Sequence, residues 1–258
     1  MGVLNVTPDS FSDGGSFVDH TAALRGAEQM LAAGAAVIDL GGESTRPGAR
    51  PVPVDEELRR VLPLLHELLK LGAIVSIDTR KPEVMRACVD AGVHMVNDVG
   101  ALRAPGALEV VADSDVAVCL MHMQGEPATM QLQPIEASVM TALTTFFTDR
   151  LARANALGIE PQRIVIDPGI GFGKSVSQNF AILNAQQALL DLGQPIMVGW
   201  SRKSSLGVVT GLSVEQRLIP SVAAALIALE RGASVLRVHD VAQTQAAVSV
   251  WLASRPTA

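Results

Sequence analysis

The sequence predicts an α/β fold, a single closed (β/α)8 barrel, and three observations support this prediction. Eight short apolar runs alternate with amphipathic stretches along the 258 residues, with no linker or low-complexity segment between them. Each run is continuously apolar, as expected of a parallel strand buried on both faces. Four helical stretches lead through a glycine-containing step into the next run, as in LAAGAA and ERGAS. We therefore expect residues 1–258 to form one TIM-barrel domain, with an open doubly wound sheet as the alternative.

The predicted elements alternate strictly along the chain. Strands are expected at 2–6, 36–41, 73–78, 94–99, 116–121, 163–167, 195–199 and 234–238. Helices are expected near 20–33, 55–71, 82–91, 105–112, 135–157, 177–191, 213–231 and 240–253. Ser213 and Gln216 form a capping-box pattern that predicts the start of the seventh helix. Pro220 inside this helix predicts either a kink or a later start.

Composition excludes several classes of protein. The chain is 48% hydrophobic with a formal net charge of −6, which indicates a globular protein and argues against a general nucleic-acid binder. No apolar run reaches the ~20 residues of a membrane span, and acidic residues near the N-terminus argue against a signal peptide. Two cysteines without a CxxC pattern are typical of reduced thiols in a cytoplasmic protein. The spacing of the histidines matches no zinc motif.

Polar residues gather where the predicted strands end, and a (β/α)8 barrel carries its chemistry at that rim. One aspartate after a strand is as often a satisfied loop residue as a site residue. So many together predict a pocket that holds both carboxylates and cations. The rim residues are Asn5, Asp39, Glu43, Asp78, Asn97, Asp98, His122, Asp167, Ser201, Arg202, Lys203, Arg237 and His239.

The residue types at this rim indicate an anionic heterocyclic ligand. Arg202 with Lys203, Arg237 with His239, and Arg46 are cations suited to a diphosphate. Carboxylate and amide groups at three other strand ends suit a heterocycle with amino and ring N–H donors. No Ser-His-Asp or Cys-His pairing is evident. The chemistry is therefore expected to depend on a good leaving group and a neutral nucleophile.

A glycine-rich run at 169–175 is similar to a phosphate-binding P-loop, but Pro168 stands where GxxxxGK[ST] needs its first glycine. The run does not match GxGxxG either. We therefore expect its glycines to shape a loop whose backbone closely approaches a ligand.

Eight motifs together resemble the dihydropteroate synthase family, in its order and spacing and over essentially the whole chain. They are NVTPDSFSDGG (5–15), GGESTRPGA (41–49), SIDTRKPEV (76–84), NDV (97–99), CLMHMQG (119–125), DPGIGFGK (167–174), SRKS (201–204) and RVHDV (237–241). The resemblance implies condensation of 6-hydroxymethyl-7,8-dihydropterin diphosphate with p-aminobenzoate, giving 7,8-dihydropteroate and diphosphate in folate biosynthesis. It also implies assistance by Mg²⁺, an SN1-like path, and competition by sulfonamides at the aminobenzoate site.

The resemblance further implies a role for each site residue. Asp78, Asn97, Asp167 and Lys203 would hold the pterin, with Met121 beside the ring and Gly199 also in the substrate site. Asn5 would be the magnesium ligand, and Arg46, Arg237 and His239 would anchor the diphosphate. Phe11, Thr45, Pro47, Phe172, Lys203 and Ser204 would form the aminobenzoate pocket, and the helix after Ser204 would receive the carboxylate. Asp13 would help to stabilise a pterin cation.

Assembly and motion can also be predicted. The segment SVAAALIALE (221–230) is more apolar around its circumference than a solvent-facing barrel helix should be, and the family pairs through this region. We therefore expect a homodimer through the last helices. The loops at 7–19 and 44–55 are rich in Gly, Pro and Ser, so we expect them to order only after pterin diphosphate binds.

Two alternative functions remain open at this stage. A pterin-binding methyltransferase domain would share the barrel and the pterin floor but would need no diphosphate anchor. A catalytically inactive pterin-binding or regulatory barrel would be expected to lack Asn5, Arg237 or His239, and all three are present.

Overall fold

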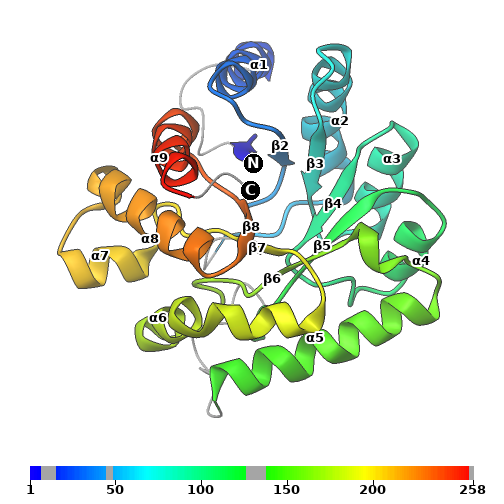
Figure 1. Ribbon diagram of the computed structural model, residues 1–258. Coiled ribbons are helices and arrows are strands. Elements are labelled where there is room, and N and C mark those ends of the chain that lie inside the picture. The colour runs from blue at the N-terminus through cyan, green and yellow to red at the C-terminus, as the bar shows by residue number, and fades with distance from the viewer. Residues whose placement is uncertain (7–15, 45–48, 126–137, 256–258) are drawn as a thin grey trace.

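A computed structural model describes residues 1–6, 16–44, 49–125 and 138–255 and shows eight parallel strands in one sheet (Figure 1). Each strand pairs with the next strand in the chain. The strands are β1 (Gly2–Asn5), β2 (Ile38–Gly41), β3 (Val75–Asp78), β4 (Met95–Asp98), β5 (Ala117–Met121), β6 (Ile164–Asp167), β7 (Ile196–Val198) and β8 (Ala233–Leu236).

The sheet closes on itself between its first and last strands. The Val3 amide donates to the Val238 carbonyl, and the Val238 amide donates to the Met1 carbonyl, each at 3.0 Å. The Met1 ammonium donates to the Leu236 carbonyl, also at 3.0 Å. This seam confirms the predicted barrel and excludes the open doubly wound sheet.

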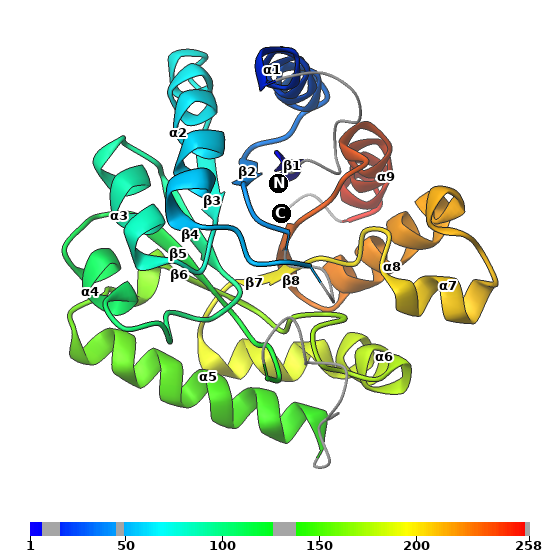
Figure 2. The same cartoon turned by 180° about the vertical axis from the view of Figure 1, so that it is seen from behind.

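Helices surround the strands, as both views of the molecule show (Figures 1 and 2). The α-helices are α1 (Ser16–Ala32), α2 (Val54–Lys70), α3 (Pro82–Asp90), α4 (Ala107–Ala112), α5 (Val139–Ala156), α6 (Val176–Ala185), α7 (Ser204–Thr210), α8 (Leu218–Glu230) and α9 (Val241–Ala253). Short 3-10 helices are η2 (Pro161–Arg163), η3 (Gln186–Leu192) and η4 (Val214–Gln216). None of the helices in the described residues is long and apolar enough to cross a membrane.

Two helix starts differ from the prediction. Helix α1 begins at Ser16, not near residue 20. The single helix predicted over 213–231 is divided: the Ser213 amide donates to the Gln216 side chain at 3.3 Å, but this pair opens only the turn η4. Helix α8 begins later, which confirms one of the two outcomes predicted from Pro220. That proline lies in the first turn of α8, where its missing N–H has no helical acceptor to lose.

The barrel interior is filled by side chains up to the level of the site. Met95, Cys119 and Met197 are buried together in the lower part of the barrel, packed against Val165 and Val235. Larger apolar clusters lie between the strands and the surrounding helices. The site therefore rests on a packed floor, as expected for this fold.

Candidate active site

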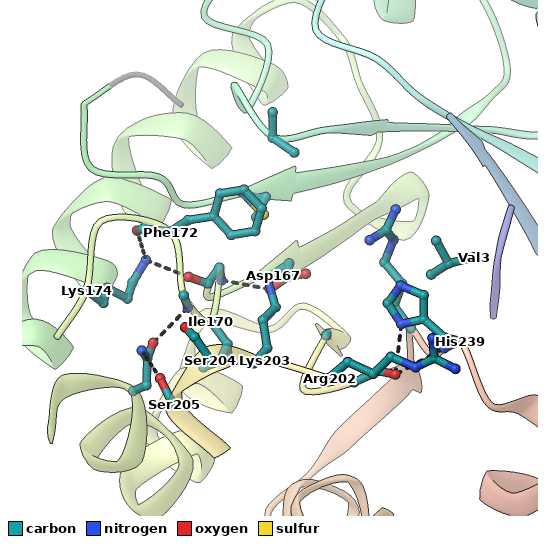
Figure 3. Close-up of a pocket in the computed structure, with 18 of the residues that line it drawn as sticks. Val3, Asp167, Ile170, Phe172, Lys174, Arg202, Lys203, Ser204, Ser205 and His239 are labelled. Carbon is teal, nitrogen blue, oxygen red and sulfur yellow. Dashed lines mark hydrogen bonds between the residues drawn. The ribbon is translucent and has the colours of Figure 1, made fainter. Parts of the chain in front are cut away.

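A cavity of about 920 Å³ opens at the carboxyl ends of the strands (Figure 3). Strand alternation explains its composition, because residues two apart along a strand point to the same side. The residue two after each floor residue therefore also faces the barrel interior, as Asn97 does after Met95 and Met121 after Cys119. The cavity lining includes one such strand-end residue from seven of the strands: Asn5, Asp78, Asn97, Met121, Asp167, Gly199 and Arg237. All seven were predicted from the sequence as site residues.

Arg237, whose side chain is 22% exposed, and three buried side chains form a network of ion pairs and hydrogen bonds at the cavity. Arg237 donates from Nε to Asp39 Oδ2 and from Nη2 to Asp78 Oδ2, each at 2.6 Å. Asn97 donates from Nδ2 to Asp39 Oδ2 at 3.1 Å. Asp39 therefore holds both the cation and the amide in place. It also orients Asn97 so that the amide oxygen is the atom available to a ligand.

Asp78 lines the cavity and has one carboxylate oxygen without a partner in the described part of the chain. Its Oδ1 atom is buried and has no hydrogen-bond partner among the described residues. Burial raises the pKa of Asp78 to about 7, although the Arg237 guanidinium acts in the opposite direction. A buried acceptor without a partner is costly, so a ligand N–H donor at this position would be favourable.

Asp167 and Lys203 both line the cavity. Asp167 accepts a hydrogen bond from the Gly169 amide to Oδ1 at 2.7 Å, and burial raises its pKa. Lys203 Nζ lies 4.3 Å from the centre of the Phe172 ring, a cation–π distance. Phe172 packs in turn against the small apolar cluster that includes Met121. An acceptor, a cation and an aromatic face thus border the same part of the cavity.

The glycine-rich loop after β6 is held by a buried lysine. Lys174 is 3% exposed and donates from Nζ to the carbonyls of His122 (3.1 Å), Gly169 (2.9 Å) and Phe172 (3.0 Å). A Cβ atom on Gly169 would lie 1.9 Å from the His122 carbonyl oxygen. The loop does line the cavity, and at Gly169 it closely approaches the backbone of His122. Burial lowers the pKa of Lys174 to about 7.

The SRKS motif (201–204) contains one residue with a left-handed backbone conformation. Arg202 has a φ of 59°, and its side chain pairs with Asp240 at 2.6 Å. On one side of it, Ser201 Oγ accepts from the His239 amide at 3.1 Å and lies 2.9 Å from His239 Nδ1. On the other side, Lys203 precedes the first residue of α7, Ser204. All of these residues line the cavity except Asp240.

Some rim residues do not act as the sequence suggested. The His122 side chain is absent from the cavity lining and packs edge-on against Phe146, with ring centres 4.8 Å apart. Burial lowers its pKa to about 3, so the ring is neutral. Asp98 accepts from the backbone amides of Gly100 (2.6 Å) and Leu102 (2.7 Å), so it orders the loop after β4. Glu43 lines the cavity, but its carboxylate is bound by Lys81.

The remaining predicted site residues fall into two groups. Phe172, Ser204 and His239 line the cavity. The other group lies outside the described residues: Phe11, Asp13, Thr45, Arg46 and Pro47. The parts of the predicted mobile loops at 7–15 and 45–48 also lie outside them.

Three buried residues near the site were given no role from the sequence: Asp39, which was predicted only as a rim residue, and Lys174 and Asn179, which were not predicted at all. A signal for Asp39 was available, since it is an acidic residue inside the apolar run VIDLG. Lys174 is the lysine of the run that only partly matches a P-loop. Nothing in the neighbouring sequence indicates that it donates hydrogen bonds to three backbone carbonyls. Asn179 lies in α6 and hydrogen-bonds to a loop and to another helix, so only the tertiary structure identifies it.

In the described part of the chain, the cavity offers few side-chain ligands to a metal ion. This suits a hard ion that is coordinated mainly by oxygens of a bound substrate. Within the described residues, no cluster of three or more His, Cys, Asp or Glu side chains could hold a metal. Asn5 lines the cavity, and its Oδ1 lies over Gly41, where a Cβ atom would come within 3.2 Å. An amide oxygen in such a cradle fits Mg²⁺, which commonly takes one or two protein oxygens and completes its shell with phosphate oxygens and water.

Comparisons with known proteins agree with this geometry. The family profile described as pterin binding enzyme matches residues 1–239. The dihydropteroate synthase of Escherichia coli K12 is 45% identical over 251 residues, covering 97% of this chain and 89% of that protein. A dihydropteroate synthase structure from Xanthomonas albilineans with 4-aminobenzoic acid has a TM-score of 0.93 and 49% identity, covering 99% of this chain and 93% of that one. A second structure of the X. albilineans enzyme, in complex with 7,8-dihydropteroate, has a TM-score of 0.89 and 46% identity, with the same coverage. The chain therefore belongs to the pterin-binding enzyme family, among the dihydropteroate synthases.

Proposed function

We propose that the protein joins 6-hydroxymethyl-7,8-dihydropterin diphosphate to p-aminobenzoate and releases 7,8-dihydropteroate and diphosphate. The observation that carries this proposal is the unpartnered, buried Oδ1 of Asp78 beside the oriented amide of Asn97. With the carboxylate of Asp167, they offer acceptors to the amino and ring N–H groups of a pterin. Lys203 would donate to the pterin carbonyl and ring nitrogen, and Met121 would pack beside the ring.

The diphosphate would lie toward the cationic side of the cavity. Arg237 has two of its nitrogens on carboxylates, and no described residue is bonded to Nη1. His239 is oriented by Ser201 and lines the same cavity. Arg46 is proposed as a third anion contact. Asn5 would hold Mg²⁺, which when bound neutralises charge on the diphosphate oxygens.

The residues favour a dissociative reaction without a protein base. Diphosphate would leave from the CH₂ carbon with the C–O bonding pair, and the electron-rich pterin would stabilise the resulting cation, with Asp13 assisting. The arylamine is neutral near pH 7, so its nitrogen lone pair can attack without prior deprotonation. One N–H proton is then lost to water. This SN1-like path agrees with the absence of a catalytic triad from the described site.

The second substrate would occupy the outer part of the cavity. Phe172 and Lys203 border it, and Ser204 begins α7 at its edge. Phe11, Thr45 and Pro47 are proposed to complete the walls. The structure of the X. albilineans relative with 4-aminobenzoic acid supports this substrate class.

The test is diphosphate release from the pterin diphosphate with and without p-aminobenzoate, each with and without Mg²⁺. We expect release that depends on p-aminobenzoate and is stimulated by Mg²⁺, together with formation of dihydropteroate. Binding of the pterin without turnover would favour an inactive pterin-binding barrel. Methyl transfer from a methylated pterin to a corrinoid, with no use of the diphosphate, would favour the methyltransferase alternative.

We also propose that the protein is a homodimer through its last helices. Helices α7, α8 and α9 expose large apolar side chains, and the most exposed are Val208 (68%), Ile219 (79%) and Val250 (72%). The predicted segment 221–230 contributes less than expected, because its alanines at 224, 225 and 228 are buried against the barrel. The exposed residues that support the proposal lie on either side of that segment.

A further inference from the structure

Asn179 has no part in the proposed chemistry, yet its side chain connects two parts of the outer site. It lies in α6, is 1% exposed, and uses both ends of its amide. Oδ1 accepts from the Gly171 amide at 2.9 Å, and Nδ2 donates to Ser205 Oγ at 2.9 Å. Figure 3 draws both bonds, with Ser205 labelled.

Each bond ends one residue away from a proposed wall of the aminobenzoate site. Gly171 precedes Phe172, whose ring lies beneath Lys203 Nζ. Ser205 follows Ser204 in the first turn of α7. One buried amide therefore joins the loop that carries the aromatic wall to the helix that carries the hydroxyl wall.

The gap spanned by this amide is narrow. A Cβ atom on Gly171 would lie 3.3 Å from Lys203 Cδ, so even one added methyl group would be crowded against the residue before α7. Hydrogen bonds of 2.9 Å at both ends are near the optimum length. A change in the length of the bridge must consequently move Phe172 or Ser204.

We propose that Asn179 is a positioning residue that sets the width of the p-aminobenzoate site by fixing Phe172 relative to Ser204. This inference rests on the proposed function and adds a determinant of second-substrate recognition. The Asn179 amide has no hydrogen bond to Asp78, Asn97 or Arg237. The network that holds the proposed pterin-binding residues is therefore independent of Asn179.

Two substitutions separate the bridge from simple packing. Asn179→Leu keeps a similar volume and removes both hydrogen bonds. Asn179→Asp keeps the acceptor for the Gly171 amide, and its second oxygen can accept from the Ser205 hydroxyl, which is able to donate as well as accept. The aspartate variant should therefore restore the geometry in part, although burial of its charge is unfavourable.

Gln186→Leu is the matched control. Gln186 is a fully buried amide just after α6, and its Nε2 donates to the carbonyls of Ala228 (2.9 Å) and Arg231 (3.1 Å). Unlike Asn179, which lines the cavity, it lies outside the cavity lining. Its replacement removes a comparable pair of buried hydrogen bonds without touching the proposed bridge.

The experiment measures steady-state KM for p-aminobenzoate and the dissociation constant of the pterin diphosphate in all four proteins. For Asn179→Leu we expect KM for p-aminobenzoate to rise about tenfold, from the loss of two net hydrogen bonds, with pterin binding within about twofold of the wild type. Asn179→Asp should recover part of this loss, and Gln186→Leu should leave both constants unchanged.

The possible results distinguish failure of this inference from failure of the proposed function on which it rests. An active wild type in which Asn179→Leu leaves KM for p-aminobenzoate unchanged, or weakens both substrates equally, would overturn the positioning role alone. The same KM shift in Gln186→Leu would also overturn it, because loss of any buried amide would then suffice. If Asn179→Leu fails to fold, Asn179→Asp decides alone: a raised KM for p-aminobenzoate with unchanged pterin binding would support the bridge, and a wild-type KM would overturn it. A wild type that forms no dihydropteroate would refute the proposed function and this inference with it.

Discussion

Arg237 Nη2 donates to Asp78 Oδ2 at 2.6 Å, although Asp78 ends β3 and Arg237 follows β8. Two other strands, β1 and β2, lie between them in the sheet. The proposed anion anchor and a proposed pterin acceptor are therefore parts of one largely buried ion pair. A change to either residue is expected to alter both ends of the site.

Removal of the Arg237 cation should destabilise the fold. Arg237→Met leaves Asp39 and Asp78 as neighbouring buried carboxylates, and breaking such a pair costs about 3–5 kcal/mol in the free energy of unfolding. The loss should be smaller at low pH, where a carboxylate can take up a proton. Urea unfolding at two pH values measures it. Arg202→Met is the control, since it removes an ion pair with Asp240 that is nearly half exposed and worth about 0–1 kcal/mol. Equal losses in the two variants would contradict the prediction.

Pterin affinity should depend on pH through Asp78. Because burial raises the pKa of this carboxyl to about 7, the folded protein holds a proton there between about pH 4 and 7 that the unfolded chain does not. The contribution of this group to stability therefore decreases as the pH rises through that window. The acceptor for a pterin N–H is the ionised form, so affinity should increase up to about pH 7 and then level off. Calorimetric titration from pH 5 to 8 tests this, and Asp78→Asn should remove the dependence. An unchanged pH profile in that variant would assign the titration to another group.

The proposed pterin-binding role of Asp167 and Lys203 can be tested by removing one charged group at a time. Asp167→Asn and Lys203→Ala should each weaken pterin binding by roughly 2–3 kcal/mol, as expected for lost hydrogen bonds to charged groups. Isothermal titration with a pterin that lacks the diphosphate isolates this effect. Lys70→Ala, on the exposed end of α2, is a suitable control. Near wild-type affinity in both site variants would refute the pocket assignment.

Two glycines with similar backbone angles should respond differently to alanine. Gly158 has a φ of 80° and open space around its missing Cβ, so Gly158→Ala should cost about 1–2 kcal/mol for the left-handed conformation alone. Gly169 has a φ of 69°, and its Cβ would collide with the His122 carbonyl. Gly169→Ala should therefore cost about 1–3 kcal/mol more, as in overpacked interiors. Thermal unfolding compares them, and similar losses would mean that the loop relaxes.

The proposed dimer can be tested by placing charge on its exposed apolar surface. Ile219→Glu with Val250→Glu should convert a dimer to a monomer in sedimentation velocity, because the acidic groups would be desolvated at the interface. Leu71→Glu, at another exposed apolar position just after α2, should remain dimeric. A wild type that sediments as a monomer would refute the assembly itself.

Much of the fold and of the central site could be predicted from the sequence because both depend on short-range periodicity. Apolar runs of fixed length define the strands, and alternation along each strand decides which residue enters the cavity. The family resemblance then supplied roles for these residues, and the cavity brings together Asn5, Asp78, Asn97, Asp167 and Arg237.

What could not be predicted depends on contacts between distant segments. Pro220 indicated two possible outcomes, and only the packing of η4 before α8 selects the later start. Asn179 looks like an ordinary polar residue of an amphipathic helix until Gly171 and Ser205 are brought to its two ends. His122 shared the rim position of the cavity-lining residues, but its ring packs against Phe146 and is absent from the cavity lining.

The seam between β1 and β8 has a consequence for the order in which the molecule can assemble. Its hydrogen bonds join residues as far apart as Met1 and Val238, so this closure has the greatest sequence separation in the barrel. Contacts of such long range are slow to form, and large domains commonly fold through intermediates. Asp78, Asn97 and Asp167 lie on β3, β4 and β6, away from the seam, whereas Asn5 and His239 lie on either side of it. A folding intermediate with an open seam would thus possess the pterin acceptors before it possessed an anion site. The capacity to bind substrate would arise in two stages on the folding pathway.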